Sequence, residues 1–409
     1  MRRDGVQPDG ATYAALTLAE ARAGRMSKAI EGLSAMASDG VEPDERIFTN
    51  IVYGFVKTRQ VAQAWETFDY MRAHIGQPSP TALALMIEAA GLEQRVNKAF
   101  QLFDEISALG GSPDVRAYNA LLSATASRDN TTQLALSTFD DMVMSGVHPD
   151  AYSYNAVIKA AAKAGNVALA AQFAGRMARA GLAPDHVTYT QMLAAHAAAM
   201  ARGGRGSRER RTELLAAADG LATEFGESAA GVAADDRARR VAANAYLSVY
   251  TRSLLLNRAR ALYTSLYGDE PGAPVRAAPS AAASVPPLPA PLVGLQPDAV
   301  SHKLLVAMYV AARRADDAHE IGKALLDAAA ADSSAPRPAY ETLTAVVHAL
   351  AKAKRLDDGV AFAERIAASG YTLHLRHVRS LNSALNHAQD GAALARLHAI
   401  CATPDPIRG

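Results

Sequence analysis

The apolar side chains of residues 151–185 fall into two stripes with the spacing of one helix face. The first stripe comprises Tyr154, Val157, Ile158 and Ala161. Gly165 then supplies a helix stop, and a second stripe over residues 167–177 predicts a second helix. A Pro-Asp turn follows, because Pro184 cannot easily continue a helix and Asp185 stands where the N-cap of another helix belongs. This stretch is therefore predicted to be a pair of helices closed by a turn.

The closing Pro-Asp dipeptide recurs along the chain. Its prolines are Pro8, Pro43, Pro113, Pro149, Pro184 and Pro297, and Pro78 falls in step although Ser79 follows it. The spacings are 35, 35, 35, 36 and 35 residues, followed by a gap of 113. A fixed period of this size indicates a solenoid, in which each unit buries its apolar face only against its neighbours.

This pattern resembles the pentatricopeptide repeat family. The matching features are an aromatic-plus-Asn start, a central Ala-Gly turn, a Met late in the second helix and the closing Gly-x-x-Pro-Asp, strongest in residues 115–185. The 34-residue tetratricopeptide unit is the competitor, but it has a Trp-Leu-Gly-Tyr signature, and the sole tryptophan, Trp65, falls in a second helix. The resemblance implies an all-α, right-handed α-solenoid (superhelix) of about nine helix-turn-helix repeats of 35 residues.

The register loosens after Asp185. The predicted organisation is a tail of a truncated repeat (1–9), five regular repeats (10–185), two degenerate repeats with a basic loop at 202–211 (186–267), a Pro/Ala-rich disordered or extended insertion (268–293), two degenerate repeats (294–374), and terminal capping helices with a tail (375–409). The fourth unit carries one extra residue near Arg128, and the seventh starts near Arg240. The ninth is expected from about Arg337, with a longer first helix.

In the family, the fifth and last residues of each unit select the base, so the resemblance implies base-reading pairs here. Three pairs have the combination that favours uracil: Asn119 with Asp150, Asn155 with Asp185, and Asn244 with Asp298. Thr49 with Ser79 leans toward adenine. Asparagine costs about 0.5 kcal/mol relative to alanine inside a helix, so its return to one repeat position suggests a task, although the closing aspartates also serve as N-caps.

The remaining units match less well. Ala14 with Asp44 and Ala84 with Asp114 occupy the selective places of the first and third units, and alanine has no group that reads a base edge. Thr190 is the selective residue of the sixth, whose closing residue the insertion obscures. Lys303 and Glu341 depart from the pattern. The implied footprint, 5′ to 3′ from the first unit, is unspecified, A-like, unspecified, U, U, unspecified, U.

Two further groups are candidates for RNA contact. The basic loop could hold phosphate or could simply be solvated; its arginines are Arg202, Arg205, Arg208, Arg210 and Arg211. Tyr118, Tyr154 and Tyr189 recur just before the selective residue. At that spacing they are expected to pack between helices rather than to stack on bases.

Composition narrows the function. Lys+Arg number 42 against 41 Asp+Glu, so a net charge of +1 gives little long-range attraction for a polyanion, and any basic surface must be local. The single cysteine, Cys401, excludes an intrachain disulfide and a cysteine-rich zinc site. No apolar run is long enough to predict a membrane span. No catalytic motif, metal spacing or cofactor signature occurs, so no enzyme, metal, cofactor or small-molecule substrate is expected.

The favoured function is sequence-selective binding of single-stranded organellar RNA, with a U-rich core, in RNA processing, stabilisation or translation. The alternative is a protein-interaction scaffold, such as a subunit of a mitochondrial ribosome or another organellar assembly; the near-neutral charge favours it. By the resemblance, the location is the mitochondrion or the chloroplast. Met1 falls late in a second helix and Gly5 in a closing turn, so the chain is expected to lack the start of a longer repeat array, with any targeting segment upstream.

Overall fold

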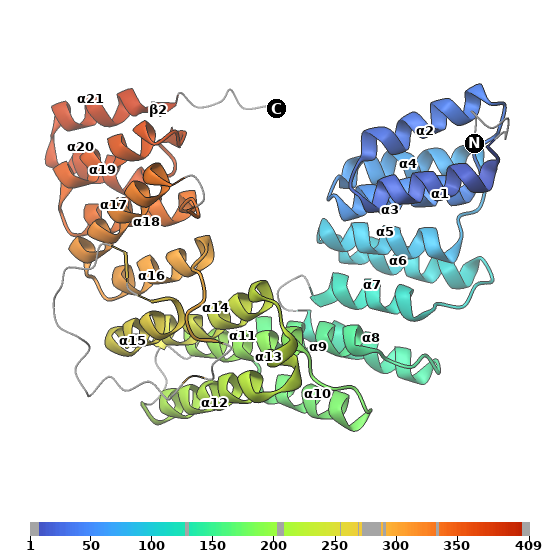
Figure 1. Cartoon of the computed structure of the whole chain (residues 1–409), viewed down its shortest axis with the longest axis horizontal. Coiled ribbons are helices and arrows are strands. Elements are labelled where there is room, and N and C mark those ends of the chain that lie inside the picture. Colours follow the sequence, from blue (N-terminus) through green and yellow to red (C-terminus); the bar gives the residue numbers. More distant parts are fainter. Residues whose placement is uncertain are drawn as a thin grey trace. The chain divides into compact units, whose positions relative to one another are not determined.

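The structure is a computed structural model that describes residues 8–126, 131–202, 208–253, 255–268, 270–271, 288, 292–332 and 335–402. The chain divides into two compact units, Met1–Ala183 and Pro184–Gly409, which are described separately below. Both are built from helical hairpins (Figure 1). The predicted all-α solenoid of helix-turn-helix repeats is therefore confirmed within each unit.

The closing residue of a repeat starts the next helix. Asp9, Asp44, Ser79, Asp150 and Asp298 are the N-caps of α1 (Gly10–Arg22), α3 (Glu45–Lys57), α5 (Pro80–Leu92), α9 (Ala151–Lys163) and α16 (Ala299–Ala311). In each case the side-chain oxygen accepts a hydrogen bond from a backbone N–H of the first turn, as from Ile47 to Asp44 at 3.2 Å. These bonds satisfy donors that no helical carbonyl can reach. The expected capping role is confirmed.

The turns inside the first, second, third and fifth hairpins each contain one residue in the left-handed region. Gly24 and Gly165 fill this place with φ of 71° and 61°, where glycine has no steric penalty. Arg59 and Gln94, each at the fifteenth place of its repeat, take the same conformation with φ of 59°. The turn is therefore set by the geometry of the repeat even where the sequence lacks glycine.

The first unit contains five hairpins. Its other helices are α2 (Met26–Ser38), α4 (Val61–His74), α6 (Val96–Ala108), α7 (Val115–Ala126), α8 (Thr132–Met144) and α10 (Val167–Arg179). The first helices of successive hairpins, α1, α3, α5, α7 and α9, pack side by side in one row (Figure 1). The second helices form another row, and each of α2, α4, α6 and α8 also packs against the first helix that follows it.

The core of the first unit lies between these two rows. Phe68 on α4 and Phe139 on α8 are fully buried, and the Phe139 ring meets the Phe173 ring edge to face at 5.2 Å. Small residues let the first helices approach closely, as where Gly91 on α5 faces Ala124 on α7. This close packing fixes the distance between neighbouring first helices. It therefore also fixes the positions of the side chains on the face of the row that does not pack against the second helices.

The second unit also consists of helical hairpins, and its helices α11, α12, α14 and α17 are longer than those of the first unit. Its elements are α11 (His186–Arg202), α12 (Arg208–Glu227), α13 (Ala229–Ala233), α14 (Asp236–Ser253), α15 (Leu256–Tyr267), α16, α17 (Ala315–Ala331), α18 (Tyr340–Lys352), α19 (Leu356–Ala368), α20 (Arg379–Ala388) and α21 (Gly391–Ile400). Here α11, α14, α16, α18 and α20 form the row of first helices. Two-residue strands, β1 (Leu373–His374) and β2 (Cys401–Ala402), pair in parallel. The terminal helices α20 and α21 join one continuous apolar core with the rest of the unit through Leu381, Leu385 and Leu397.

The Pro/Ala-rich insertion differs from the expectation at both ends. Glu270 is only 8% exposed; its carboxylate accepts hydrogen bonds from Arg260 at 3.1 Å and from the hydroxyl of Tyr309 at 2.5 Å. Leu292 is buried at the other end. The prediction that this run does not pack is therefore wrong for its ends, because a buried carboxylate that finds a guanidinium and a hydroxyl can be tolerated in a core. Residues 272–287 lie outside the described chain.

Three other expectations need correction. Arg208, Arg210 and Arg211 lie in the first turn of α12 rather than in a loop, since arginine is a good helix former. The first helix of the ninth repeat, α18, has the ordinary 13 residues, and the longer helix is α17. That repeat also begins at Tyr340, three residues later than expected. The first seven residues, Arg128 with its extra residue, and Arg205 fall outside the described part of the chain.

Among the described helices, none is both long and apolar enough to cross a membrane.

Candidate nucleic-acid interface

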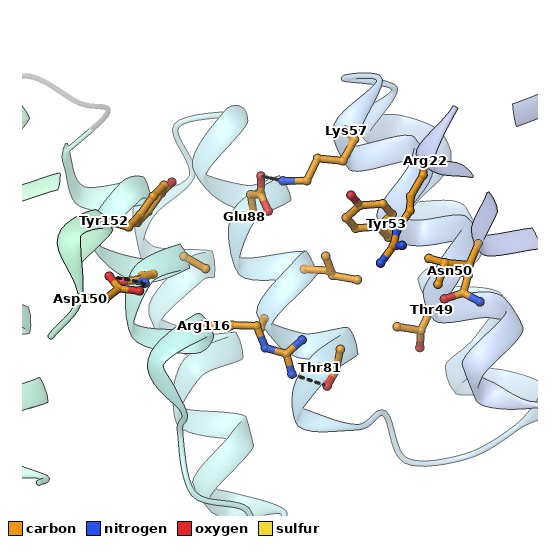
Figure 2. A pocket seen from close by; sticks show the side chains of 15 residues that line it. Arg22, Thr49, Asn50, Tyr53, Lys57, Thr81, Glu88, Arg116, Asp150 and Tyr152 are labelled. Carbon is orange, nitrogen blue, oxygen red and sulfur yellow. Dashed lines mark hydrogen bonds and ion pairs between the residues drawn. The ribbon is translucent and has the colours of Figure 1, made fainter. Parts of the chain in front are cut away.

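A groove runs along the row of first helices in the first unit (Figure 2). Its larger part has a volume of about 540 Å³, and its lining includes Thr49, Ala84 and Asn119, the fifth residues of the second, third and fourth repeats. A second hollow of about 450 Å³ extends it over α1 and α3 and is lined by Ala14, Thr49 and Ser79. We call the two together the first-helix groove. The predicted selective positions of repeats one to four therefore line one surface.

Asn119 and Asp150 form a hydrogen-bonded pair in this groove. The Asn119 Nδ2 donates to both Oδ1 and Oδ2 of Asp150 at 3.1 Å, and the Asn119 Oδ1 accepts from the Ser153 hydroxyl at 2.6 Å. Asp150 Oδ1 also accepts the backbone N–H of Ser153 at 2.9 Å as the N-cap of α9. The closing aspartate therefore both caps the following helix and fixes the amide of the preceding repeat.

The selective pairs of the first three repeats are different. Thr49 is half-buried in the groove, and Ser79, its partner in the code, caps α5 and donates its backbone N–H to Glu45 at 2.7 Å. Ala14 and Ala84 present only a methyl group. Their closing residues are Asp44, half-buried, and Asp114, exposed; each accepts an N–H of the following helix, from Ile47 at 3.2 Å and from Ala117 at 2.9 Å.

Among the next selective residues, Asn155 is buried, whereas Asp185 and Thr190 are half-buried. Asn155 is 9% exposed, and Asp185 accepts the N–H of Thr188 at 2.8 Å at the start of α11. Thr190 donates its hydroxyl to the His186 carbonyl one turn back, at 2.7 Å.

Asn244 in the second unit is paired as Asn119 is, but inside the core. Its Nδ2 donates to Asp298 Oδ1 at 3.1 Å, and its Oδ1 accepts the hydroxyl of Tyr267 at 2.7 Å. Asn244 is only 6% exposed, whereas Asn119 is half-buried and open to the groove. Arg240 Nε lies 3.6 Å from the other Asp298 oxygen.

At its fifth place the eighth repeat has an ion-paired lysine instead of an asparagine. Lys303 occupies its fifth place and pairs with Glu341. Because α18 begins at Tyr340, Glu341 is the second residue of the ninth repeat and Thr344 is the fifth. The sequence register, which put Glu341 at the fifth place, is thus three residues out, since the closing Pro-Asp turn that marks other repeats is missing there.

Cations that the sequence analysis did not single out line the groove. Arg22 and Lys57 are the last residues of α1 and α3, and Lys57 pairs with Glu88 at 2.8 Å (Figure 2). Partial burial acts against the charge of Lys57, but the hydrogen bond and charge of Glu88 outweigh it and raise the pKa of the amine. Both cations occupy the thirteenth place of their repeats. A basic residue that recurs after 35 residues was therefore the sequence pattern from which they could have been predicted.

The second residues of repeats two to five also line the groove. Arg46, Thr81, Arg116 and Tyr152 take this place in repeats two to five and all contribute to the lining. Tyr152 is 54% exposed. The fourth places just behind the selective residues, in contrast, are buried: Tyr118 packs on Phe103 at 4.9 Å and Tyr154 on Phe139 at 5.1 Å.

Tyr189 behaves in the same way in the second unit. It is 5% exposed and packs on Phe225 at 5.5 Å, and burial together with its hydrogen bond to Glu224 raises its pKa to about 12. The expected packing role of the three tyrosines is confirmed.

Within the described residues, no group of three histidine, cysteine or carboxylate side chains is placed to hold a metal ion.

Sequence comparison matches two stretches to repeat families. Residues 113–163 and 152–198 match the PPR repeat family, and residues 1–106 match a family described as pentatricopeptide repeat-containing protein. None of the curated protein sequences compared with the chain matches it.

Three solved structures resemble the chain, one of them with a TM-score above 0.5. The pentatricopeptide repeat protein PPR10 from maize superposes with a TM-score of 0.51 at 18% identity, over 99% of this chain and 61% of that protein. PPR10 in complex with an 18-nt psaJ RNA element gives 0.38 at 19% identity, covering 97% and 54%. The PPR domain of protein-only RNase P 1 from Arabidopsis thaliana, in complex with tRNA, gives 0.37 at 16%, covering 44% and 94%. The chain thus spans about three fifths of the length of PPR10.

The 35-residue period, the helical hairpins capped by closing aspartates, and the matches over residues 1–106 and 113–198 agree on one family. The chain is a pentatricopeptide repeat protein.

Proposed function

We propose that this chain binds single-stranded RNA in the first-helix groove and selects bases one repeat at a time. The observation that carries the proposal is the Asn119–Asp150 pair, an amide held in one orientation on an open groove. A single N–H shared between the two Asp150 oxygens leaves the second N–H and one lone pair of the carbonyl for a ligand. Adjacent donor and acceptor groups of this kind can pair with a base edge, and single-stranded RNA exposes such edges.

The other lining residues suit the rest of a nucleotide. Arg22 and Lys57 supply positive charge for a phosphate backbone, although the total charge of the chain is only +1. The exposed ring of Tyr152 offers a flat apolar face beside Asn119, and aromatic rings stack on bases of any sequence. The groove thus combines charge, stacking and one oriented amide.

By the family code, the fourth and fifth repeats would read two consecutive uracils through Asn119 with Asp150 and Asn155 with Asp185. Asn244 with Asp298 would read a third, but its burial makes it the weakest of the three. The remaining site assignments, Thr49 with Ser79, Asp44, Asp114 and Thr190, belong to the same proposal. The chain would act in organelle RNA processing, stabilisation or translation by occupying RNA, in a mitochondrion or a chloroplast, as the family resemblance suggests.

The test is a titration of the purified chain with short single-stranded RNAs that differ only in the central UU, at about 50 and 200 mM salt. We expect tighter binding to the UU sequence, and Asn119→Ala to reduce the preference at one position by roughly tenfold. If Asn119→Ala and Asn155→Ala both leave the UU preference unchanged, the base-reading assignment is wrong.

A protein-interaction scaffold remains the second candidate, because the balanced charge is unusual for a nucleic-acid binder. Failure of every RNA to bind at low salt would favour the scaffold and reject the RNA proposal.

A further inference from the structure

The first and third repeats lack a selective side chain but share another feature. Their fifth residues are Ala14 and Ala84, and in both cases the following repeat begins with an arginine at its second place, Arg46 or Arg116. After the repeats with asparagine at the fifth place, the second residue is Tyr152, Val187 or Val300. Alanine at the fifth place of a repeat therefore accompanies arginine at the second place of the next repeat.

The closing aspartate holds whichever group is present. Where the fifth residue is asparagine, the carboxylate binds that amide, as Asp150 binds Asn119. Where it is alanine, the carboxylate binds the arginine: the Arg46 Nε donates to Asp44 Oδ2 at 2.8 Å, and the Arg116 Nε donates to Asp114 Oδ2 at 3.3 Å. In both cases Oδ1 remains the cap of the next helix.

Stability does not account for these arginines. Each is the second residue of a helix, α3 or α7, where the partial positive charge of the helix end disfavours a cation. Their side chains are 70% and 68% exposed, and an ion pair so exposed contributes little to folding. The two arginines are therefore better explained by a ligand than by the fold.

Both guanidinium groups face the groove. Arg46 lines the hollow beside Ala14, and Arg116 lines the larger part beside Ala84. Figure 2 shows the Arg116 side chain extended across the groove toward Thr81, whose hydroxyl it meets at 3.2 Å. With Nε on the aspartate, Nη1 and the remaining Nη2 hydrogen form a donor edge that is held in a fixed plane.

We propose that Arg46 and Arg116 read guanine opposite the first and third repeats, in place of the missing fifth-position side chain; this rests on the proposed RNA binding. A planar edge made only of donors needs two adjacent acceptors, which guanine offers as O6 and N7 and cytosine as O2 and N3. Guanine is the better fit of the two because of the space at these repeats. Uracil separates its acceptors with an N–H, and adenine sets an amino group beside N7. The alanine methyls leave room for a purine. The footprint of the first unit then becomes G, A-like, G, U, U.

The experiment measures affinity of the full chain for RNAs of the form XAYUU, with each base in turn at X and at Y. For the unmodified chain, G at Y is expected to bind roughly tenfold tighter than A, C or U. Arg116→Gln should abolish the preference at Y and leave X unchanged, and Arg46→Gln should do the reverse. Arg95→Gln, which removes an exposed arginine from the N-cap of α6 outside the groove, is the matched control and should preserve both preferences.

Two results would overturn the inference while leaving RNA binding intact. If Arg116→Gln keeps the preference for G at Y, that preference does not come from this side chain and Arg116 is not a reader. If the unmodified chain binds all four bases at Y equally, or prefers C, guanine reading is wrong. Absence of all RNA binding by the unmodified chain would instead reject the proposed function, and this inference with it.

Discussion

At the scale of single residues, recurrence in the sequence located the oriented asparagines but not their surroundings. Asn119 and Asn244 stand at the same repeat position with the same aspartate partner, yet one opens to a groove and the other is buried under Tyr267. That difference depends on a tyrosine 23 residues away, which no local pattern reveals. Arg46 and Arg116 were missed for a related reason, because their role depends on contacts with residues of the preceding repeat.

Buried histidines predict a residue-scale pH effect. His196 and His302 are 3% and 6% exposed, and burial lowers the pKa of both, opposed at His196 by a hydrogen bond to Met192 and at His302 by Asp298. A folded pKa below the unfolded value of about 6.5 means that the unfolded chain binds more protons in acid. The contribution of the two neutral histidines to the free energy of unfolding is thus complete above about pH 6.5 and is lost as the pH falls.

As the pH is lowered from about 7.5 to about 5.5, we expect the urea concentration at the unfolding midpoint to decrease. The decrease should be smaller in the His196→Phe/His302→Phe variant. Each ring also has one buried nitrogen without a partner in the described structure, so an apolar ring should be tolerated. An equal pH dependence in the variant and the unmodified chain would show that other groups control the acid response.

At the scale of elements, the helices were largely predictable, because apolar stripes mark them and a capping residue precedes α1, α3, α5, α9 and α16. α9 begins at Ala151 after Asp150, as the Pro-Asp turn predicted. The predictions were wrong where no such turn marks the start of a helix. α18 begins three residues later than predicted, and α12 includes arginines that were predicted to lie in a loop. The first residue of a helix is therefore predicted correctly only where a turn motif precedes it.

Close approach of α5 and α7 gives a prediction at this scale. A Cβ on Gly91 would lie 2.9 Å from the Cα of Ala124, and backbone cannot move aside cheaply. Gly91→Ala should therefore destabilise the chain by about 1–3 kcal/mol. Gly175→Ala on α10, where no atom lies within 4 Å, is the control and should stabilise by about 0.5–1 kcal/mol. Urea unfolding measures both; stabilisation by both substitutions would contradict the packing described.

At the scale of the whole molecule, the balance of charge extends into the groove, where Arg22, Lys57 and Arg116 lie beside Glu88 and Asp150. The sequence required any basic surface to be local, and in the larger part of the groove the three cations exceed the two carboxylates by only one charge. It could not predict which of the 42 basic residues converge, since convergence follows from the stacking of repeats rather than from any single stretch.

Few groove cations imply a shallow salt dependence. Each phosphate contact with single-stranded nucleic acid contributes about 0.7 to the slope of log affinity against log salt. The double variant Arg22→Gln/Lys57→Gln should therefore reduce the measured slope by about 1.4 and leave the base preference unchanged. An unchanged slope would mean that the RNA backbone does not pass along the ends of α1 and α3.

The central claim is that RNA lies in the first-helix groove with one base at Asn119. The most direct measurement is photocrosslinking of an RNA that carries a single 4-thiouridine at the base assigned to the fourth repeat, followed by mapping of the crosslinked peptide. The account predicts attachment to α7 or to the start of α9, with the exposed ring of Tyr152 the principal acceptor. A bound RNA that crosslinks instead to the second helices, such as α8 or α10, would contradict it.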